Sequence, residues 1–374
     1  MRFRPILFPL TAIVIVGGAF VYRGCADETL PAPLDRAPYL QNVTPRQATV
    51  IWQTKDAVPT QISWGLPGKT PRTVRGKTAA TAHSFRLNNL EPNTTYRYRV
   101  TGNAAPGQFT TAPPPNSSTR FRFAAWGDSG SGEAGQLNLA PQLIKYQPAF
   151  TVHTGDLIYP RGAWSDYDPK FFGVYAPLLR DSPFYGSLGN HDNVTQKGAP
   201  WLANFQFPRN GPKGITPERN YSFVWGNAQF WILDGNTTGA EMRVIADWLR
   251  KSITQSKATW KFAVFHQPPY SSGLHGGTNV VKKYYSPVLE NGIDVVLNGH
   301  DHDYERFAPK GTATYIVTGA GGAVRYPKKH DEPDSVFYDN QNWSFSAFTI
   351  EGKFLKAQQI ATSGTILDEW RLSK

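Results

Sequence analysis

The chain has 374 residues, of which 40% are hydrophobic and 18% are charged. This balance supplies enough apolar material for a packed core and excludes a disordered, fibrous or coiled-coil protein, while the length predicts two domains. The single cysteine excludes an intrachain disulfide, and the net charge of +11, spread along the chain without a nucleic-acid-binding motif, favours anionic substrates over nucleic acid.

Residues 1–26 have the pattern of an export segment. Two arginines precede an apolar run from Pro5 to Tyr22, and small residues follow at Gly24 and Ala26. Cleavage after Ala26 would make the segment a signal peptide, whereas an uncleaved run of this length could span a bilayer as an anchor. Gly24-Cys25 also resembles the end of a bacterial lipobox. In each case we expect the working domains outside the cytoplasm, secreted or periplasmic, with membrane attachment only through this segment.

Residues 37–112 are predicted to form a small all-β domain. Apolar and polar residues alternate in short runs such as Val50–Trp52 and Tyr96–Val100, which is typical of half-buried strands. The segment Leu90–Tyr96 resembles the corner of a fibronectin type III sandwich, where a tyrosine ties back to the preceding loop. The proline-rich segment 113–119 has the composition of an extended linker and marks the predicted domain boundary.

Beyond the linker, strand and helix patterns alternate, which predicts an α/β domain over residues 120–374. Strands are expected at Phe121–Trp126 and Phe150–Thr154, and helices at Leu137–Tyr146 and Phe171–Leu179. Two further sets of apolar residues recur at helical spacing, and the C-terminal part is expected to be rich in strands. The helical sets are Met242, Ile245, Ala246 and Leu249, and Val281, Tyr284, Tyr285 and Val288.

Five short polar motifs each follow an apolar, strand-like run. Because ligands bind at the carboxyl ends of the strands in α/β sheets, we expect the motifs to meet at one edge. Their glycines would let the backbone turn sharply beside a ligand. In chain order the motifs are Gly127-Asp128-Ser129-Gly130, Gly155-Asp156-Leu157-Ile158-Tyr159, Gly189-Asn190-His191-Asp192, Val264-Phe265-His266 and Gly299-His300-Asp301-His302-Asp303-Tyr304-Glu305-Arg306.

The side chains of these motifs are carboxylates, an amide, a phenol and imidazoles, without a thiolate. Hard and borderline metal ions prefer such donors. His300 and His302, two residues apart in an extended chain, would project to the same side. A single motif would be weak, since Gly-Asp after a strand is commonly a turn, but together the motifs predict seven ligands around two metal ions.

The five motifs, in this order and spacing, resemble the calcineurin-like metallophosphoesterase superfamily. Tyr159, three residues after Asp156, makes the chain similar to the purple acid phosphatases in particular. The resemblance extends over nearly the whole chain after the export segment, because larger members of that family also carry a fibronectin-like domain. It implies an α/β catalytic domain of two sheets packed as a β-sandwich flanked by helices, preceded by a small all-β fibronectin III-like sandwich.

The resemblance also implies a dinuclear centre of ferric iron and a divalent ion, which in the family is iron, zinc or manganese. A hydroxide whose pKa the ions lower would attack phosphorus, so no protein nucleophile is needed. In this chain the implied ligands are Asp128, Tyr159 and His302 for the ferric iron, Asn190, His266 and His300 for the second ion, and Asp156 as the bridge.

Two further histidines are predicted to be catalytic. The leaving alkoxide needs a proton, and the phosphoryl group needs hydrogen-bond donors. His191 lies next to Asn190, and His275 follows His266 in a loop that matches the family's substrate-binding histidine position. His153, in an apparent strand, is expected to pack in the core.

The roles of several charged residues in the motifs stay open. Asp192 stands where family members often have glutamate. The sequence therefore does not predict which residue orients His191. Asp301, Asp303, Glu305 and Arg306 would either orient the metal-binding histidines or remain solvated loop charges. Because Cys25 is the only cysteine, we expect no disulfide-linked dimer.

The sequence therefore predicts an exported hydrolase, an acid phosphatase that acts on small phosphate monoesters. A phosphodiesterase or nucleotide hydrolase using the same site is the first alternative, because selectivity depends on loops such as Asn193–Asn220. The second alternative is an envelope-binding protein with a residual metal site. The sequence does not predict the physiological ester or the oligomeric state.

Overall fold

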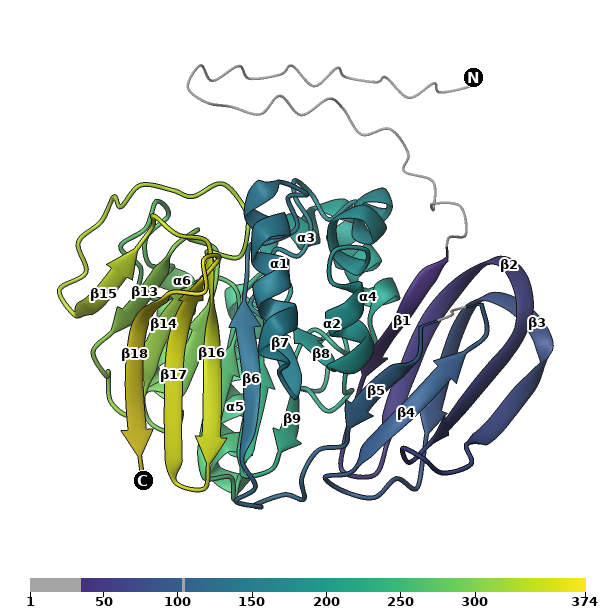
Figure 1. Cartoon of the computed structure of the whole chain (residues 1–374). Helices are drawn as coiled ribbons and strands as arrows, with labels where there is room; N and C mark the ends of the chain where they lie inside the picture. Colours follow the sequence, from purple (N-terminus) through teal and green to yellow (C-terminus); the bar gives the residue numbers. More distant parts are fainter. Residues whose placement is uncertain (1–34, 103–104) are drawn as a thin grey trace, which may run out of the picture. The chain divides into compact units, whose positions relative to one another are not determined.

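The computed structural model describes residues 35–102 and 105–374, and the predicted export segment, with Cys25, lies outside the described residues. Within the described part, the strands form three sheets (Figure 1). No helix in this part of the chain is long and apolar enough to cross a membrane.

The first sheet is antiparallel and makes up the N-terminal β domain. Its strand order is β1-β2-β4-β5, and β3 also pairs with β2. The hydroxyl of Tyr96 accepts a hydrogen bond from the amide of Glu91 at 2.9 Å, so this tyrosine is tied to the preceding loop as expected. The strands are β1 (Arg36–Gln41), β2 (Ala48–Gly65), β3 (Arg72–Leu87), β4 (Thr95–Val100) and β5 (Gly107–Thr110).

The other two sheets form the α/β part, which agrees with the predicted fold class. One has the order β18-β17-β16-β6-β7-β8, with β6, β7 and β8 parallel, and the other has the order β15-β13-β14-β12-β11-β10-β9, with β10, β11, β12 and β14 parallel. The strands are β6 (Phe121–Trp126), β7 (Phe150–His153), β8 (Phe184–Gly186), β9 (Tyr221–Trp225), β10 (Ala228–Ile232), β11 (Trp260–Val264), β12 (Val295–Asn298), β13 (Tyr304–Phe307), β14 (Thr314–Thr318), β15 (Ser335–Asp339), β16 (Ser344–Glu351), β17 (Phe354–Ala361) and β18 (Ile366–Ser373).

Helices connect and cover these sheets. In α5 the hydroxyl of Thr238 accepts a hydrogen bond from the amide of Glu241, whose carboxylate accepts one from the amide of Thr238, so the helix begins at a capping box. The predicted apolar face of α5 is buried against residues of β10, β11 and β12. The helices are α1 (Ala134–Tyr146), η1 (Trp164–Asp166), α3 (Asn190–Val194), η3 (Thr195–Gly198), α4 (Ala199–Asn204) and α5 (Gly239–Gln255), besides those given below.

Two predicted helices are interrupted. In each, a proline, Pro177 or Pro287, lies in the first turn of the second helical piece. Proline lacks an N–H group and its ring clashes with the carbonyl four residues earlier, so the prediction of continuous helices was wrong. The pieces are the π-helix η2 (Asp168–Phe172) and α2 (Ala176–Asp181), and α6 (Asn279–Tyr284) and α7 (Ser286–Leu289).

Aromatic side chains fill the space between the two α/β sheets. The ring of Phe123, on β6, stacks on that of Phe348 with centroids 4.6 Å apart. The same ring meets Phe230 and Phe262 of the opposite sheet edge-on, at 5.1 Å and 5.3 Å. These contacts join the sheets into the expected sandwich and hold the strands whose ends carry the polar motifs.

We predict that Phe123→Ala lowers the free energy of unfolding by about 3–5 kcal/mol, because it leaves a cavity at the centre of this core. Phe123 is fully buried, whereas Phe354, also on a strand, is 68% exposed. Phe354→Ala is therefore the matched control and should change stability by less than about 0.5 kcal/mol. Urea denaturation of both variants measures the difference, and equal effects would contradict this description of the core.

Candidate metal centre

The predicted metal ligands follow strands that end at one edge of the α/β part. Asp128 follows β6, Asp156 follows β7 and Asn190 follows β8. In the second sheet, His266 follows β11, and His300 follows β12. Because these strands are parallel within each sheet, their carboxyl ends lie together and bring the five motifs into one place.

One half of the centre is built around Tyr159. Its hydroxyl lies 3.0 Å from Asp128 Oδ1 and 3.1 Å from Asp156 Oδ2. The same hydroxyl is 2.9 Å from His302 Nε2, which in turn is 3.6 Å from Asp128 Oδ1. The other ring nitrogen of His302 is hydrogen-bonded to the carbonyl of Val324, which fixes the orientation of the imidazole.

The other half is built around Asn190. Its side-chain oxygen lies 2.9 Å from His266 Nε2 and 3.0 Å from His300 Nδ1. His266 Nε2 is also 3.2 Å from Asp156 Oδ2. Since that carboxylate also contacts Tyr159, Asp156 joins the two halves.

The centre is buried and its charges are only partly balanced. Burial, reinforced by the charge of Asp156, raises the pKa of Asp128 well above its usual value. Burial alone would lower the pKa of His266, but the carboxylates of Asp156 and Asp128 outweigh it and raise this pKa to about 9. Burial lowers the pKa of His300 to about 2 and that of His302 to about 4, which leaves both imidazoles neutral.

The backbone at the centre is strained. Asp128, Asp156 and His300 have φ angles of 57°, 55° and 74°, a left-handed conformation that residues other than glycine rarely adopt. Each costs on the order of 1 kcal/mol or more, and such strain clusters at functional sites. A Cβ atom added at Gly189 would overlap Asp156 Oδ1, and one added at Gly299 would overlap Asp128 Oδ2, so two glycines make room for the carboxylates.

The donor set fits two metal ions. Two carboxylates, a phenol, an amide oxygen and three imidazoles suit one hard ion and one borderline ion. Asp128, Asp156 and His266 bring one ligand atom each to within 4.8 Å of one another. The buried like charges of the two aspartates are the feature that cations would relieve.

Two family matches cover most of the chain. Residues 121–304 match the family described as "Calcineurin-like phosphoesterase", and residues 36–124 match "Purple acid Phosphatase, N-terminal domain". The chain belongs to the calcineurin-like phosphoesterases of the purple acid phosphatase type. The expected family, the fold class and the hydrolase class are thereby confirmed, while the domain limits and the fibronectin resemblance stay predictions.

The chain is similar to individual proteins of this family over most of its length. It is 27% identical over 293 residues to purple acid phosphatase 4 of Arabidopsis thaliana, covering 70% of this chain and 86% of that protein. A second Arabidopsis thaliana relative, named "Probable inactive purple acid phosphatase 1", is 22% identical over 373 residues, covering 82% of this chain and 60% of that protein. The solved structure of a purple acid phosphatase from yellow lupin (Lupinus luteus) seeds has the same fold, with a TM-score of 0.76 and 20% identity, covering 90% of this chain and 74% of that one.

The two predicted catalytic histidines lie against predicted metal ligands. The ring of His191 is 4.6 Å from that of Tyr159, and its Nε2 is 4.0 Å from Asp156 Oδ2. The ring of His275 stacks on His300 with centroids 4.4 Å apart. Their catalytic roles stay predictions.

The interpretation of the acidic residues near His302 as solvated loop charges was wrong. Asp301, Asp303 and Glu305 are fully buried. The side chains of Asp301 and Asp303 both lie beside Gly273, in the loop of His275. Asp301 accepts hydrogen bonds from the amide of His275 and from Ser271 Oγ, at 2.8 Å and 2.5 Å.

Glu305 holds the loop of His275 at a second point, because its carboxylate accepts a hydrogen bond from the amide of Ser272 at 2.7 Å. Arg306 points elsewhere and forms an ion pair with Asp368 at 2.6 Å. These carboxylates therefore shape the loop that carries His275, while Arg306 joins two strands.

Asp192 and His153 also have structural partners. The Asp192 carboxylate accepts hydrogen bonds from the amides of Leu157, Ile158 and Gly189 at 3.0–3.1 Å, and burial raises its pKa to about 7. Asp192 thus fixes the loop before Tyr159. His153 is buried as expected, with Nε2 2.9 Å from Ser129 Oγ.

The sequence did not predict that Tyr326 packs against the residues of the metal centre. Its ring stacks on that of His302 with centroids 4.0 Å apart, and it meets His275 edge-on at 5.5 Å. Burial and the nearby Asp128 charge raise its pKa to about 12. The only signal was indirect, a glycine-rich run at residues 319–322 that directly follows β14.

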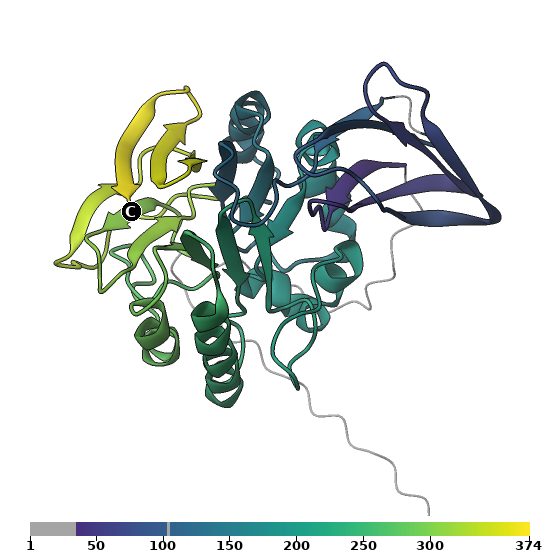
Figure 2. The same cartoon turned by 90° about the horizontal axis from the view of Figure 1, so that it is seen from below.

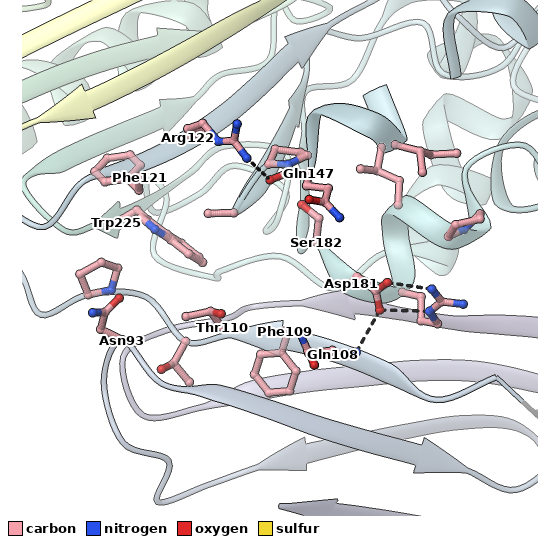
Figure 3. Close-up of a pocket in the computed structure, with 18 of the residues that line it drawn as sticks. Asn93, Gln108, Phe109, Thr110, Phe121, Arg122, Gln147, Asp181, Ser182 and Trp225 are labelled. Carbon is pink, nitrogen blue, oxygen red and sulfur yellow. Dashed lines mark hydrogen bonds and ion pairs between the residues drawn. The ribbon is translucent and has the colours of Figure 1, made fainter. Parts of the chain in front are cut away.

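A cavity of the N-terminal β domain and the α/β part does not coincide with the metal centre. It has a volume of about 620 Å³ and is lined by Phe121 and Arg122 at the start of β6, Ser182 before β8, Trp225, and residues of β5 such as Thr110 (Figure 3). Since Asp128 follows the other end of β6, this cleft lies at the opposite ends of the strands. None of the predicted site residues lines it.

We predict that Gly299→Ala abolishes tight metal binding while the protein stays folded, because the added methyl group would displace the Asp128 carboxylate. Gly76→Ala is the matched control, since its Cβ would lie at an ordinary 3.5 Å from Thr60. Elemental analysis after loading with zinc, together with circular dichroism, measures both properties. Wild-type metal content in Gly299→Ala would contradict the arrangement described above.

Proposed function

We propose that the protein is an exported, metal-dependent acid phosphatase that hydrolyses small phosphate monoesters at a dinuclear centre. The observation that carries the proposal is the convergence of seven donors from five strand ends, joined through Asp156. Calcineurin-like phosphoesterase membership supports the reaction class. The export, the absence of a disulfide-linked dimer and the absence of a nucleic acid partner stay predictions.

The donors divide into two groups of different hardness. Asp128, Tyr159 and His302 would hold a ferric ion, and Asn190, His266 and His300 would hold iron, zinc or manganese as a divalent ion. Burial raises the pKa of the Tyr159 phenol well above its usual value, so a strongly polarising cation is needed to ionise it, which favours ferric iron. When bound, two such ions supply Lewis acidity toward phosphoryl oxygens and a water of lowered pKa.

The three histidines of the donor set differ in pKa. A histidine binds a metal only when neutral. Because burial lowers the pKa of His300 to about 2 and that of His302 to about 4, both stay neutral donors in mildly acidic solution. His266 differs from them, because the nearby carboxylates raise its pKa to about 9 and it must lose a proton when a metal binds.

His191 and His275 would interact with the bound substrate. His191 lies on the exposed side of Tyr159, where it can give a proton to the leaving oxygen. His275, packed on His300, can donate a hydrogen bond to a phosphoryl oxygen. Neither residue is needed as a nucleophile.

We predict that His191→Ala and His275→Ala each lower kcat for p-nitrophenyl phosphate by about 100-fold, as expected for the loss of a proton donor or an oxyanion donor, with metal content unchanged. His330→Ala removes an exposed histidine and serves as the control. Steady-state kinetics on metal-loaded protein measure the effect. An unaltered kcat in both variants would exclude the proposed catalytic roles of His191 and His275.

We predict that the iron-loaded protein is purple and that Tyr159→Phe removes the visible band, because the band arises from charge transfer between the phenolate and ferric iron. Tyr326→Phe is the matched control, since Tyr326 also packs against His302 but is not a predicted metal ligand. Absorption spectra at equal iron content separate the two variants. A band that survives in Tyr159→Phe would exclude this tyrosine as a ligand.

Two alternatives keep the same metal centre. Hydrolysis of bis(p-nitrophenyl) phosphate or of nucleotides faster than of the monoester would favour a phosphodiesterase or nucleotide hydrolase. The relative named as inactive makes an envelope-binding protein with a residual site the second alternative. Metal-loaded protein that hydrolyses none of these esters would favour that alternative.

A further inference from the structure

A partly buried ion pair joins the N-terminal β domain to the α/β part. The Arg36 side chain, on β1, is 4% exposed and forms two parallel hydrogen bonds to Asp168, at 2.6 Å and 2.7 Å. Its remaining Nη1 group donates to Asn204 Oδ1 at 2.7 Å, and its guanidinium lies 3.8 Å from the centroid of the Phe172 ring. A bidentate pair of this kind fixes geometry as well as distance.

Asp168 begins the short π-helix η2, and Lys170 lies two residues further along. The Lys170 ammonium group donates to the carbonyl of Tyr159 at 2.7 Å and to Asp166 Oδ2 at 3.1 Å. The carbonyl of Lys170 accepts a hydrogen bond from Gln136 Nε2 at 2.5 Å. The single turn of η2 thus contacts the β domain through Asp168, and it contacts the backbone of Tyr159 through Lys170.

The backbone of Tyr159 has two hydrogen bonds. Its amide donates to the carbonyl of Gly130 at 2.9 Å, and its carbonyl accepts from Lys170. Without the second bond the main chain could rotate and draw the phenol away from Asp128 and Asp156, which it now approaches to 3.0–3.1 Å. Metal affinity depends on the residues that orient the ligands, and losing one typically costs 10–100-fold.

We propose that Lys170 is a positioning residue for Tyr159 and that Arg36, through Asp168, holds Lys170 in place. This gives the N-terminal β domain a role at the metal centre, although none of its residues contributes a predicted ligand. The inference rests on the proposed function, because Tyr159 must be a ligand for its position to matter.

Lys170→Met tests the first step, since methionine keeps much of the stem and removes the donor. At equal iron content we expect a shifted or weakened visible band, and in competition with a chelator about tenfold weaker binding of ferric iron. Lys170→Arg, which keeps a charged donor, should retain most of the band. Lys145→Met is the matched control, because Lys145 is an exposed lysine at the end of α1.

The readouts distinguish positioning from general stability. A Lys170→Met protein with the wild-type band and affinity overturns the proposal, whatever its melting temperature. If that variant does not fold, Asp166→Asn weakens the second contact of the lysine and should change the band in the same direction, and an unchanged band there also overturns it. If the unsubstituted protein itself binds no iron, the proposed function fails and the inference fails with it.

Arg36→Met tests the second step. We expect a change of the band in the same direction as in Lys170→Met, and no further change when the two substitutions are combined, because coupled residues are not additive. A lower melting temperature with an unaltered band would show that Arg36 serves only to attach the β domain. Additive effects would show that the two residues act independently, and either result overturns the role of Arg36.

Discussion

Two buried carboxylates constrain the centre of this protein. Asp128 and Asp156 are at most 1% exposed, and both have left-handed backbone conformations. Burying two like charges is costly unless cations or hydrogen bonds compensate. The chain compensates in part, with the imidazole of His266 and with hydrogen bonds from the amides of His191 and His300. The charge that remains unbalanced is the physical reason why metal ions would be stabilised at this edge of the two sheets.

The rest of the fold keeps this unfavourable arrangement in place. Parallel strands from two sheets end beside the carboxylates, and the aromatic core around Phe123 locks the sheets together. Asp301 and Glu305 hold the loop of His275 from one side. On the other side the ion pair between Arg36 and Asp168 attaches the β domain close to the loop of Tyr159. Stability of the scaffold and geometry of the site are therefore coupled through a small number of buried polar contacts.

The convergence of the polar side chains at one edge was predictable from sequence, because Asp128 and its counterparts follow apolar runs that fix both their edge and their direction, while their role as metal ligands stays a prediction. Helix limits were less predictable, since Pro177 falls within an otherwise regular apolar pattern and ends it. The burial of Asp303 was missed because the segment that covers it, around Gly273, is distant in the sequence. Tyr326 and Lys170 belong to no motif, and only the path of the chain between strands brings them to the centre.

The most direct test of this account is a crystal structure of the protein loaded with ferric iron and zinc, with anomalous difference maps recorded at the absorption edge of each metal. We expect two peaks about 3.5–4 Å apart, as in other two-metal sites, with Asp156 touching both. The iron peak should lie beside Asp128, Tyr159 and His302, and the zinc peak beside Asn190, His266 and His300. A single peak, or peaks away from these side chains, would contradict a dinuclear centre joined through Asp156.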